Sequence, residues 1–273
     1  MLSAWLGEHR STLPAHLALD GKRIREHLGT IVTLCDIQEQ VPVAVRATIE
    51  KGGEQSASRA LLRSEEVHLL ESTVSLDALY ANPENARLIV QEKGGQYLIS
   101  LKDNQPTLLA HTTAQLAGTH FASEPEVRGG ELIERELSAA PLRSESAAFP
   151  HVAQAVCARR AITHKKSGKE TRGTRHYITS RSPAQASPPH LAKLVRGHWS
   201  VENNIHWLRD AVWNEDACRT HDPNTACALA LLRTTLLAPL RSAGHRSPQQ
   251  AVELFAHKST SPCASSSTNA SLS

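Results

Sequence analysis

The chain has 273 residues, 40% of them hydrophobic, and a formal net charge of only +3. It is long enough to bury a large core, as one domain or as one domain with an insertion, and its overall charge does not require a nucleic-acid partner. Its five cysteines are odd in number and scattered, which predicts neither a disulfide framework nor a metal cluster and fits a reducing cytoplasm. We see no signal peptide and no apolar run of the ~20 residues that span a membrane, so we expect a cytoplasmic protein without membrane contact.

The first half of the chain predicts a mixed α/β sheet. Apolar runs bounded by turn residues predict strands, and segments between them predict helices. Strands are expected at residues 16–20, 30–36, 41–49, 69–77 and 96–101, and helices at residues 56–64, 85–93 and 107–116. Three successive strands followed by alternating helix and strand favour a mixed sheet flanked by helices.

Two of the predicted strands end at a carboxylate. Asp20 closes one apolar run and precedes Gly21, and Asp77 closes another. For a single aspartate of this kind, a turn or a helix cap is the simpler interpretation. Ligands and metals collect at strand ends in open α/β sheets, so two such aspartates together favour a shared site.

From residue 121 to residue 180 the pattern becomes more β-like. Ala/Ser/Pro-rich linkers are expected near residues 138–150 and at residues 182–189. Residues 151–181 hold eight Lys or Arg and one acid, Glu170. A local patch of this kind suits phosphate contacts, although a solvated hairpin loop around Lys166-Ser167-Gly168-Lys169 is the simpler alternative.

A helix is predicted over residues 190–213, and its two faces differ. One face is apolar and the other carries side chains that can bind metals. The apolar stripe is Val201, Ile205, Leu208 and Val212, and the polar stripe is His198, Glu202, His206 and Asp210. Three of the four tryptophans, Trp199, Trp207 and Trp213, also lie here.

The polar stripe has three interpretations. A solvated helix face is the simplest, with pairs such as His198 and Glu202 adding a few tenths of a kcal/mol. A zinc site on His198, Glu202 and His206 lacks the HExxH signature, and side chains at this spacing rise by ~6 Å per step. In the third, Glu202 joins Asp20 and Asp77 in one cleft. Three carboxylates there suit Mg²⁺ or Mn²⁺, and two such ions ~4 Å apart support phosphoryl transfer.

Ordered motifs along the chain resemble those of insertion-sequence transposases of the DDE type, specifically the H-repeat-associated protein group. The Lys-x-Asn-Gln-Pro and His-Trp-x-x-Glu-Asn motifs are fairly specific, whereas Asp-Gly-Lys alone is weak. The matching pieces are Leu19-Asp20-Gly21-Lys22 with Arg25; Glu50-Lys51 with Glu54; Asp77-Ala78-Leu79; Gly95 through Pro106; Tyr177 through Ser180; and His198 through Asn203 with His206-Trp207, Asp210 and Glu215-Asp216. The resemblance extends from about Leu17 to about Leu236.

This resemblance implies a ribonuclease H-like α/β fold with a mixed sheet flanked by helices and a β-rich insertion before the last catalytic helix. It implies that Asp20, Asp77 and Glu202 are both the catalytic and the metal-binding residues, with Mg²⁺ as cofactor and Mn²⁺ as a substitute. The implied activity is cleavage of transposon ends by activated water, followed by strand transfer from the freed 3′-hydroxyl. The implied partners are DNA at the transposon ends and at the target, with a homodimer on DNA and association with the bacterial nucleoid.

The same resemblance suggests DNA contacts. Lys102, Asn104 and Gln105 support the site or touch DNA, or they form a polar strand-to-helix turn before Pro106, because proline is ordinary in the first turn of a helix. His198 contacts a phosphate when protonated, or is a plain helix-face histidine. The expected basic grip on DNA consists of Lys165, Lys166, Lys169, Arg172 and Arg175.

Together these patterns predict four parts of the chain. Nine of the fifteen residues at 259–273 are Ser or Thr, which predicts disorder, and a further apolar helix is expected at residues 224–241. The predicted parts are residues 1–120, the first part of the catalytic core; residues 121–189, the basic β-rich insertion with its linkers; residues 190–245, the C-terminal catalytic helices; and residues 246–273, a disordered tail.

Two alternatives to an active transposase stay open at this point. One is a metal-dependent nuclease that uses the same three acids for hydrolysis alone. The other is a catalytically inactive DNA-binding remnant. Only nineteen residues precede Asp20, where family members generally carry a helical stretch, and the polar tail also departs from their pattern. An altered or truncated copy is therefore expected.

Overall fold

The computed structural model describes residues 14–25, 28–118, 121–122, 125–143, 145, 148–201, 205–245, 247, 250–251 and 253–254, with residues 121–122 described by their backbone alone. Its strands form one sheet in the order β3-β2-β1-β4-β5-β10-β9-β8-β6, and β7 pairs with β8. The strands are β1 (His16–Ile24), β2 (Gly29–Asp36), β3 (Val41–Thr48), β4 (Thr73–Leu76), β5 (Gln96–Leu101), β6 (Phe121–Ala122), β7 (Glu126–Arg128), β8 (Glu131–Pro141), β9 (Gln154–His164) and β10 (Glu170–Thr179).

The first five strands form the mixed part of the sheet. β1, β2 and β3 are an antiparallel meander, whereas β4 and β5 run parallel to β1. Leu17 and Leu19 are buried on one face of β1 and Ala18 on the other, so this strand is covered on both sides. The mixed sheet predicted from the sequence is confirmed.

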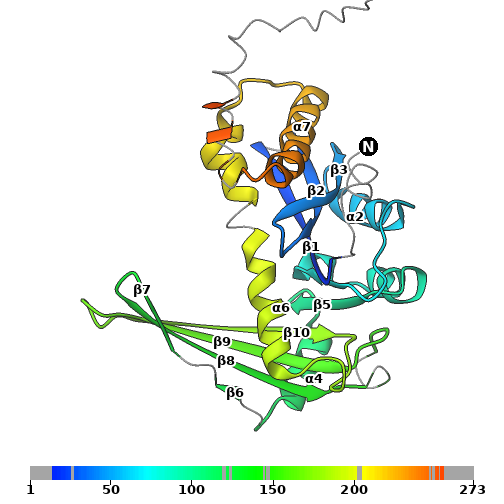
Figure 1. Ribbon diagram of the computed structural model, residues 1–273. Helices are drawn as coiled ribbons and strands as arrows, with labels where there is room; N and C mark the ends of the chain where they lie inside the picture. The colour runs from blue at the N-terminus through cyan, green and yellow to red at the C-terminus, as the bar shows by residue number, and fades with distance from the viewer. Residues whose placement is uncertain are drawn as a thin grey trace, which may run out of the picture.

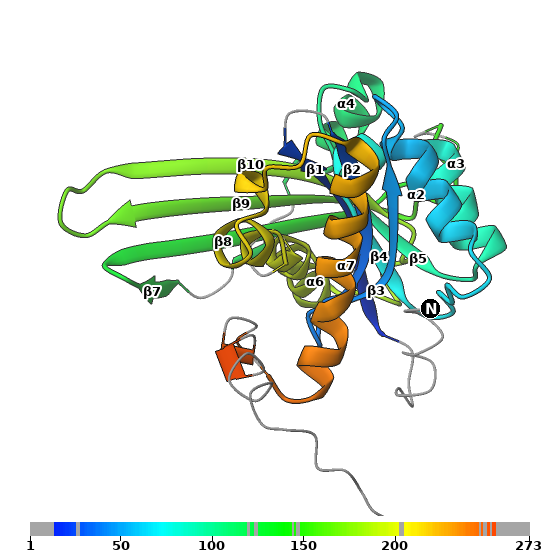
Figure 2. The ribbon, with the colours of Figure 1, turned by 90° about the horizontal axis from the view of Figure 1, so that it is seen from above.

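Helices cover both faces of this sheet (Figure 2). One side carries α2 (Glu54–Arg63), α3 (Pro83–Arg87) and α4 (Pro106–Gln115), whose Leu61, Ala86 and Leu108 share the main core with Leu17 and Leu19. The other side carries α6 (Pro188–Val201) and α7 (Pro223–Ser242). None of the helices in the described part of the chain is both long and apolar enough to cross a membrane.

Strands β8, β9 and β10 continue the sheet as a long ribbon that projects from the body of the molecule (Figures 1 and 2). Only residues 176–179 of β10 pair with β5, so the rest of β10 extends past the core together with β9 and β8. We call residues 131–137 and 158–175 the wing. Near its base the wing lies against α6 (Figure 1).

Several sequence predictions need correction. β1 does not end at Asp20 but continues to Ile24, because β2 pairs with it as far as Gly29. The strand predicted over residues 69–77 is confined to Thr73–Leu76. β8 continues to Pro141, which lies in the linker predicted near residues 138–150. α6 begins at Pro188, inside the linker predicted at residues 182–189.

The helices predicted over residues 56–64, 107–116 and 224–241 are the α-helices α2, α4 and α7, whereas two other predicted helices are correct in place but not in geometry. The helix predicted over residues 85–93 consists of α3 followed by a π-helical turn, η3 (Leu88–Glu92). The helix predicted over residues 190–213 comprises α6 to Val201 and, after residues 202–204, a segment with a second π-helical turn, η5 (Leu208–Val212). Glu202 and the polar tail at residues 259–273 lie outside the described residues.

Candidate active site

The two aspartates singled out in the sequence lie side by side in the sheet. Leu19 of β1 is in register with Leu76 of the parallel strand β4, so the next residues, Asp20 and Asp77, occupy neighbouring positions. Adjacent strands lie about 4.8 Å apart, which brings these residues close to one another although 57 residues separate them in the chain. Asp77 leaves β4 in an extended conformation and begins the short helix η2 (Ala78–Tyr80).

Asp77 is half-buried and accepts two side-chain contacts from β5 and the turn that follows it. Ser100 donates to its Oδ1 at 2.9 Å, and the ammonium of Lys102 lies 3.3 Å from its Oδ2. Burial alone would raise the pKa of Asp77, but hydrogen bonds from the Ala78 amide and Ser100, with the charge of Lys102, lower it below its ordinary value. The carboxylate is therefore held in its charged form, as a cation ligand must be.

Asp20 is more enclosed than Asp77, with 17% of its side chain exposed. The Gly21 amide donates to its Oδ1 at 2.8 Å, and Nδ1 of His206 lies 3.6 Å from its Oδ2. Burial lowers the pKa of His206 to about 3, so this imidazole is neutral at physiological pH. On the same strand, Lys22 forms an ion pair with Asp210 at 2.6 Å. The segment after α6 therefore faces β1.

Gly21 lies beneath a buried hydrogen bond next to Asp20. The Tyr80 hydroxyl donates to Oε1 of Glu54 at 2.6 Å, which links η2 to α2. A Cβ on Gly21 would collide with this carboxylate and hydroxyl. Burial raises the pKa of Tyr80, and Glu54, Asp20 and Asp77 raise it further, so the tyrosine stays protonated as a donor. This position of β1 can be occupied only by glycine unless Glu54 or Tyr80 moves.

α6 is attached to β4 through a chain of two histidines and a serine. Ser75 Oγ lies 2.9 Å from Nε2 of His16 and 3.0 Å from Nδ1 of His198. Gly197 permits the close approach, because a Cβ there would lie 2.7 Å from the His16 ring. Burial lowers the pKa of His198 to about 4, and this favours a positioning role over a contact with phosphate through a charged imidazole.

The histidines exclude the simplest interpretation of the polar stripe. His198 is 8% exposed, and the side chain of His206 is 14% exposed, so these members of the stripe do not form a solvated helix face. The apolar stripe is buried as predicted, with Val201, Ile205 and Leu208 in one cluster with Ala18 of β1. His198 and His206 therefore face protein, with His206 directed to Asp20, whereas Asp210 pairs with Lys22 and its side chain is 41% exposed.

Asn104 and Gln105 have a structural function in the turn after β5. The amide of Asn104 donates to the Ala78 carbonyl at 2.7 Å, and that of Gln105 donates to the Ala81 carbonyl at 2.8 Å. Both bonds hold the segment that follows Asp77, while 63% of the Lys102 side chain remains exposed beside it. Contact of these residues with DNA stays a prediction.

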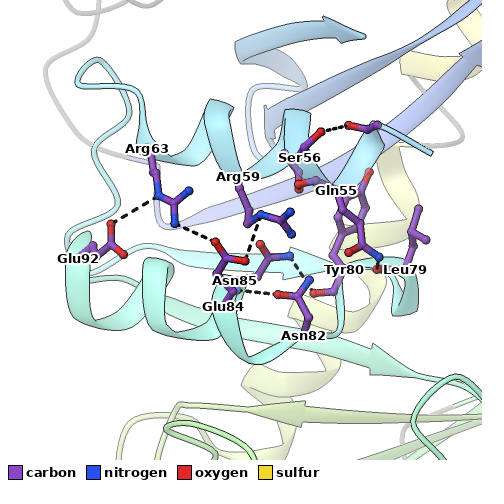
Figure 3. Close-up of polar contacts among 12 residues, drawn as sticks. Gln55, Ser56, Arg59, Arg63, Leu79, Tyr80, Asn82, Glu84, Asn85 and Glu92 are labelled. Atoms are coloured by element: carbon purple, nitrogen blue, oxygen red, sulfur yellow. Dashed lines mark hydrogen bonds and ion pairs between the residues drawn. The ribbon is translucent and has the colours of Figure 1, made fainter. Parts of the chain in front are cut away.

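The other side of this segment is held by α2 and α3 (Figure 3). Gln55 donates to the Leu79 carbonyl at 3.0 Å, and Asn85 donates to the Tyr80 carbonyl at 3.0 Å. Arg59 and Arg63 of α2 both contact Glu84 of α3. Asp77 thus lies at the start of a segment with fixed hydrogen bonds on both sides.

A buried ion pair links η5 to the residues that follow it. Arg209 and Glu215 are fully buried, and Nε of Arg209 donates to Oε2 of Glu215 at 2.8 Å. A second bond joins Nη2 to Oε1 at 2.5 Å, so the pair is bidentate. It joins η5 to the short helix η6 (Glu215–Ala217) directly after the segment that carries His206.

The basic residues of the predicted DNA grip lie on the wing rather than around the aspartates. Lys165, Lys166 and Lys169 are exposed in the turn between β9 and β10. Arg172 donates to Glu170 at 2.7 Å, and the Arg175 guanidinium lies 3.6 Å above the ring of Trp199 on α6. Of these residues, Arg175 is placed next to the helix that packs over β4.

The groups in this region that could bind a cation are carboxylate oxygens. Asp20 and Asp77 are hard oxygen donors on adjacent strands, and such donors suit Mg²⁺ or Mn²⁺ better than zinc. Among the described residues, no group of three or more His, Cys, Asp or Glu gathers as a metal cluster, and Glu202 is not among those residues. The donors present fit a divalent ion that needs further ligands.

Comparison with known proteins identifies the family of the chain. A family model described as "Transposase DDE domain" matches residues 11–238. The chain belongs to the DDE transposase family. The mixed sheet with its flanking helices is accordingly the ribonuclease H-like core of that family, and membership implies the use of a divalent metal ion.

Relatives in this family are similar over most of the chain. "Putative transposase YncI" of Escherichia coli O157:H7 is 26% identical over 259 residues, covering 87% of this chain and 65% of the relative. "H repeat-associated putative transposase YhhI" of Escherichia coli strain K12 is 24% identical over 246 residues, covering 81% of this chain and 63% of the relative. The chain thus spans slightly less than two thirds of these DDE transposase relatives. The H-repeat-associated group named from the sequence motifs is confirmed as a similar group.

Some residues of the site were not singled out as site residues from the sequence. Ser75, Ser100 and Tyr80 make hydrogen bonds around Asp77 and Asp20, yet each is an ordinary residue in its segment. Ser75 and Ser100 occupy strands β4 and β5 at positions where an apolar residue would satisfy the strand pattern equally well. For Ser100, its place among apolar residues of β5 was an available signal.

Proposed function

We propose that this chain is a DNA transposase that cleaves the ends of an insertion sequence and joins them to target DNA. Asp20, Asp77 and Glu202 are the proposed catalytic carboxylates and metal ligands, and Mg²⁺ is the proposed ion, for which Mn²⁺ substitutes. Transposon ends and target DNA are the proposed substrates, and a homodimer on DNA in the bacterial cytoplasm is the proposed assembly. The observation that carries this proposal is the adjacency of Asp20 and Asp77 on β1 and β4.

Helix α6 supports the third carboxylate of this proposal. His198, one helical turn before Glu202 in the sequence, is attached to Ser75, and Ser75 lies two residues before Asp77 on β4. Val201, the residue before Glu202, is buried with Ala18 and Cys35 of β1 and β2. The chain thus approaches Glu202 from a helix that is fixed to the strands carrying both aspartates.

Divalent ions in such a site activate the attacking oxygen and stabilise the leaving oxygen of a phosphodiester. The protein's part is to keep its carboxylates charged and in place. Ser100 and Lys102 do this for Asp77, and the Gly21 amide holds the carboxylate of Asp20 in place. Phosphate oxygens add negative charge near these acids, and the exposed ammonium of Lys102 offsets part of it.

The test uses DNA duplexes that carry the flanking ends of the element, incubated with Mg²⁺ or Mn²⁺. Wild type is compared with Asp20→Asn, Asp77→Asn and Glu202→Gln, each of which keeps the side-chain shape but removes the charge. We expect metal-dependent nicking in the wild type and a loss of at least about 100-fold in every variant. Asp103→Asn is the matched control, because Asp103 is an exposed acid in the turn after β5.

Three results would contradict parts of the proposal. A variant of the three that keeps full activity would remove that residue from the catalytic set. Cleavage without joining to a second DNA, with 3′-hydroxyl ends accumulating, would favour a nuclease of the same fold. A folded wild type without metal-dependent cleavage would favour an inactive DNA-binding remnant.

A further inference from the structure

The strand register divides the side chains of the wing between two faces. Residues paired across antiparallel strands point to the same face, and successive residues alternate. The paired residues Tyr177 and Val156 pack with Leu194 of α6, whereas their neighbours Ile178 and Ala155 belong to the core shared with α4. We call these sides of the ribbon the α6 face and the α4 face.

Charge is distributed unevenly between these faces beyond the core. The pairing of residues along β7–β10 shows to which face each charged residue of the wing and of β7 points. The α6 face carries Arg128, Arg135, Arg160 and Arg175 with Glu126 and Glu131, and the α4 face carries Arg159 and Arg172 with Glu134, Glu136 and Glu170. Arginine exceeds glutamate on the α6 face, and the reverse holds on the α4 face.

The arginines of the α4 face lie beside carboxylates. Arg172 donates to Glu170 at 2.7 Å, and Arg159 lies 3.9 Å from Glu136 on the neighbouring strand. Their charge is therefore largely balanced within that face. An approaching polyanion would meet three glutamates there as well as two arginines.

The α6 face is open as well as basic. Arg160 is exposed at the centre of the ribbon, in register with Arg135 on β8 and with Gly173 on β10. A Cβ on Gly173 would meet no atom within 4 Å, so space remains above that strand. Arg135 contacts Glu126 and lowers its pKa. Arg128 and Arg196 of α6 lower the pKa of Glu126 further. The positive field on this side therefore extends from the wing to α6.

This face continues to the carboxylate site. Arg175 stacks on Trp199, which directly follows His198 in α6. Burial lowers the pKa of His198 most; Asp77 raises it and Arg175 lowers it further, so both charges lie within electrostatic reach of one imidazole. A strand of DNA with a phosphate near Asp77 would next meet Arg175 and then Arg160.

We propose that the α6 face of the wing, through Arg160, Arg175 and Arg135, binds the sugar–phosphate backbone of DNA that extends from the carboxylate site, and that the α4 face does not. The inference rests on the proposed transposase function and adds the surface and the direction of the DNA. Guanidinium groups suit phosphates because they offer several donors in a fixed plane. Backbone contacts carry no sequence information, so they act equally on cognate and unrelated DNA.

The first test compares neighbouring arginines of β9 that point to opposite faces. Arg160→Gln and Arg159→Gln each remove one exposed charge from the same strand. Binding of a fluorescein-labelled DNA duplex of arbitrary sequence is measured by anisotropy over a range of salt concentrations. Arg160→Gln should weaken binding several-fold and reduce the slope of log affinity against log salt by about 0.9, whereas Arg159→Gln should change neither.

The second test adds a charge instead of removing one. Gly173→Lys places an ammonium next to Arg160 on the α6 face, and Thr174→Lys places one on the α4 face beside Arg159. Gly173→Lys should strengthen binding and increase the salt slope by about 0.9, and Thr174→Lys should leave both near the wild-type value. Circular dichroism and thermal unfolding verify that each variant is folded.

Each outcome decides between the faces. Equal losses for Arg160→Gln and Arg159→Gln, or a stronger gain for Thr174→Lys than for Gly173→Lys, would overturn the assignment while leaving DNA binding intact. A folded wild type that does not bind DNA at low salt would overturn both the inference and the proposed function. Loss at Arg160 together with gain at Gly173 supports the α6 face.

Discussion

Ser75 connects two largely enclosed histidines to the strand that precedes Asp77. Its hydroxyl contacts His16 at the start of β1 and His198 near the end of α6. Both imidazoles are removed from water, which lowers the pKa of His16 to about 3 and that of His198 to about 4. Protonation of either residue would place a charge in a buried contact between the sheet and α6. Acid should therefore favour the unfolded chain, in which these histidines take up protons more readily than in the folded protein.

The stability of the protein should fall as the pH is lowered from 7 to 5. Both histidines have a folded-state pKa below the ordinary value of 6.5, so under pH 6.5 the unfolded chain takes up protons that the folded chain does not. Each histidine should cost roughly 2 kcal/mol of unfolding free energy at pH 5. Urea unfolding at both pH values measures this loss. His16→Gln should lose about 2 kcal/mol less than wild type between them, and an equal loss would contradict the prediction.

Gly21→Ala should destabilise the protein, because a methyl group there collides with the Glu54–Tyr80 hydrogen bond. Such overpacking costs typically about 1–3 kcal/mol, and the residue is next to Asp20. Thermal unfolding compares this variant with Gly173→Ala, whose added methyl meets no atom within 4 Å. An unfolding midpoint for Gly21→Ala equal to that of the control would show that Glu54 or Tyr80 moves without cost.

At the scale of elements, the sequence predicts what depends on local pattern. The strand at Gln96–Leu101 has the predicted bounds, and the helix predicted over residues 107–116 is found one residue earlier, at Pro106–Gln115, with the proline in its first turn. The extension of β1 past Asp20 was not predictable in this way, because it depends on pairing with β2. The burial of His198 likewise depends on Ser75, which is 123 residues away in the chain. Long-range partners decide these features, and periodicity contains no information on them.

The link from η5 to η6 depends on the buried pair of Arg209 and Glu215. Arg209→Met would leave the Glu215 carboxylate buried without its partner, which typically costs about 3–5 kcal/mol. Chemical denaturation measures the loss. Adding Glu215→Gln to Arg209→Met should recover much of it, because the unpaired charge is then removed. If the double variant is no more stable than Arg209→Met, the loss comes from packing of the arginine side chain rather than from the charge.

At the scale of the whole molecule, a compact body and a projecting ribbon share one sheet (Figure 1). The buried clusters include residues of β8, β9 and β10 near β5, such as Leu137, Val156 and Ile178, but none from residues 159–175. Most of the latter segment is exposed, and it carries most of the basic residues noted in the sequence. The body therefore contains the buried clusters that stabilise the fold, together with the two aspartates. The wing carries exposed basic residues that contribute little to those clusters.

Shortening the wing should separate these two contributions. Arg160 and Gly173 are paired across β9 and β10, so replacing residues 161–172 by an Asn-Gly turn keeps the register of both strands. The variant should unfold cooperatively and lose no more than about 2 kcal/mol, mainly from exposure of Ile133, which pairs with the deleted Ile162. Its DNA binding should depend less steeply on salt, because Lys165, Lys166 and Lys169 are deleted. Denaturant unfolding and salt-dependent anisotropy measure both effects.

Failure to fold would place the distal wing within the cooperative core, and an unchanged salt slope would remove the turn lysines from the DNA contact.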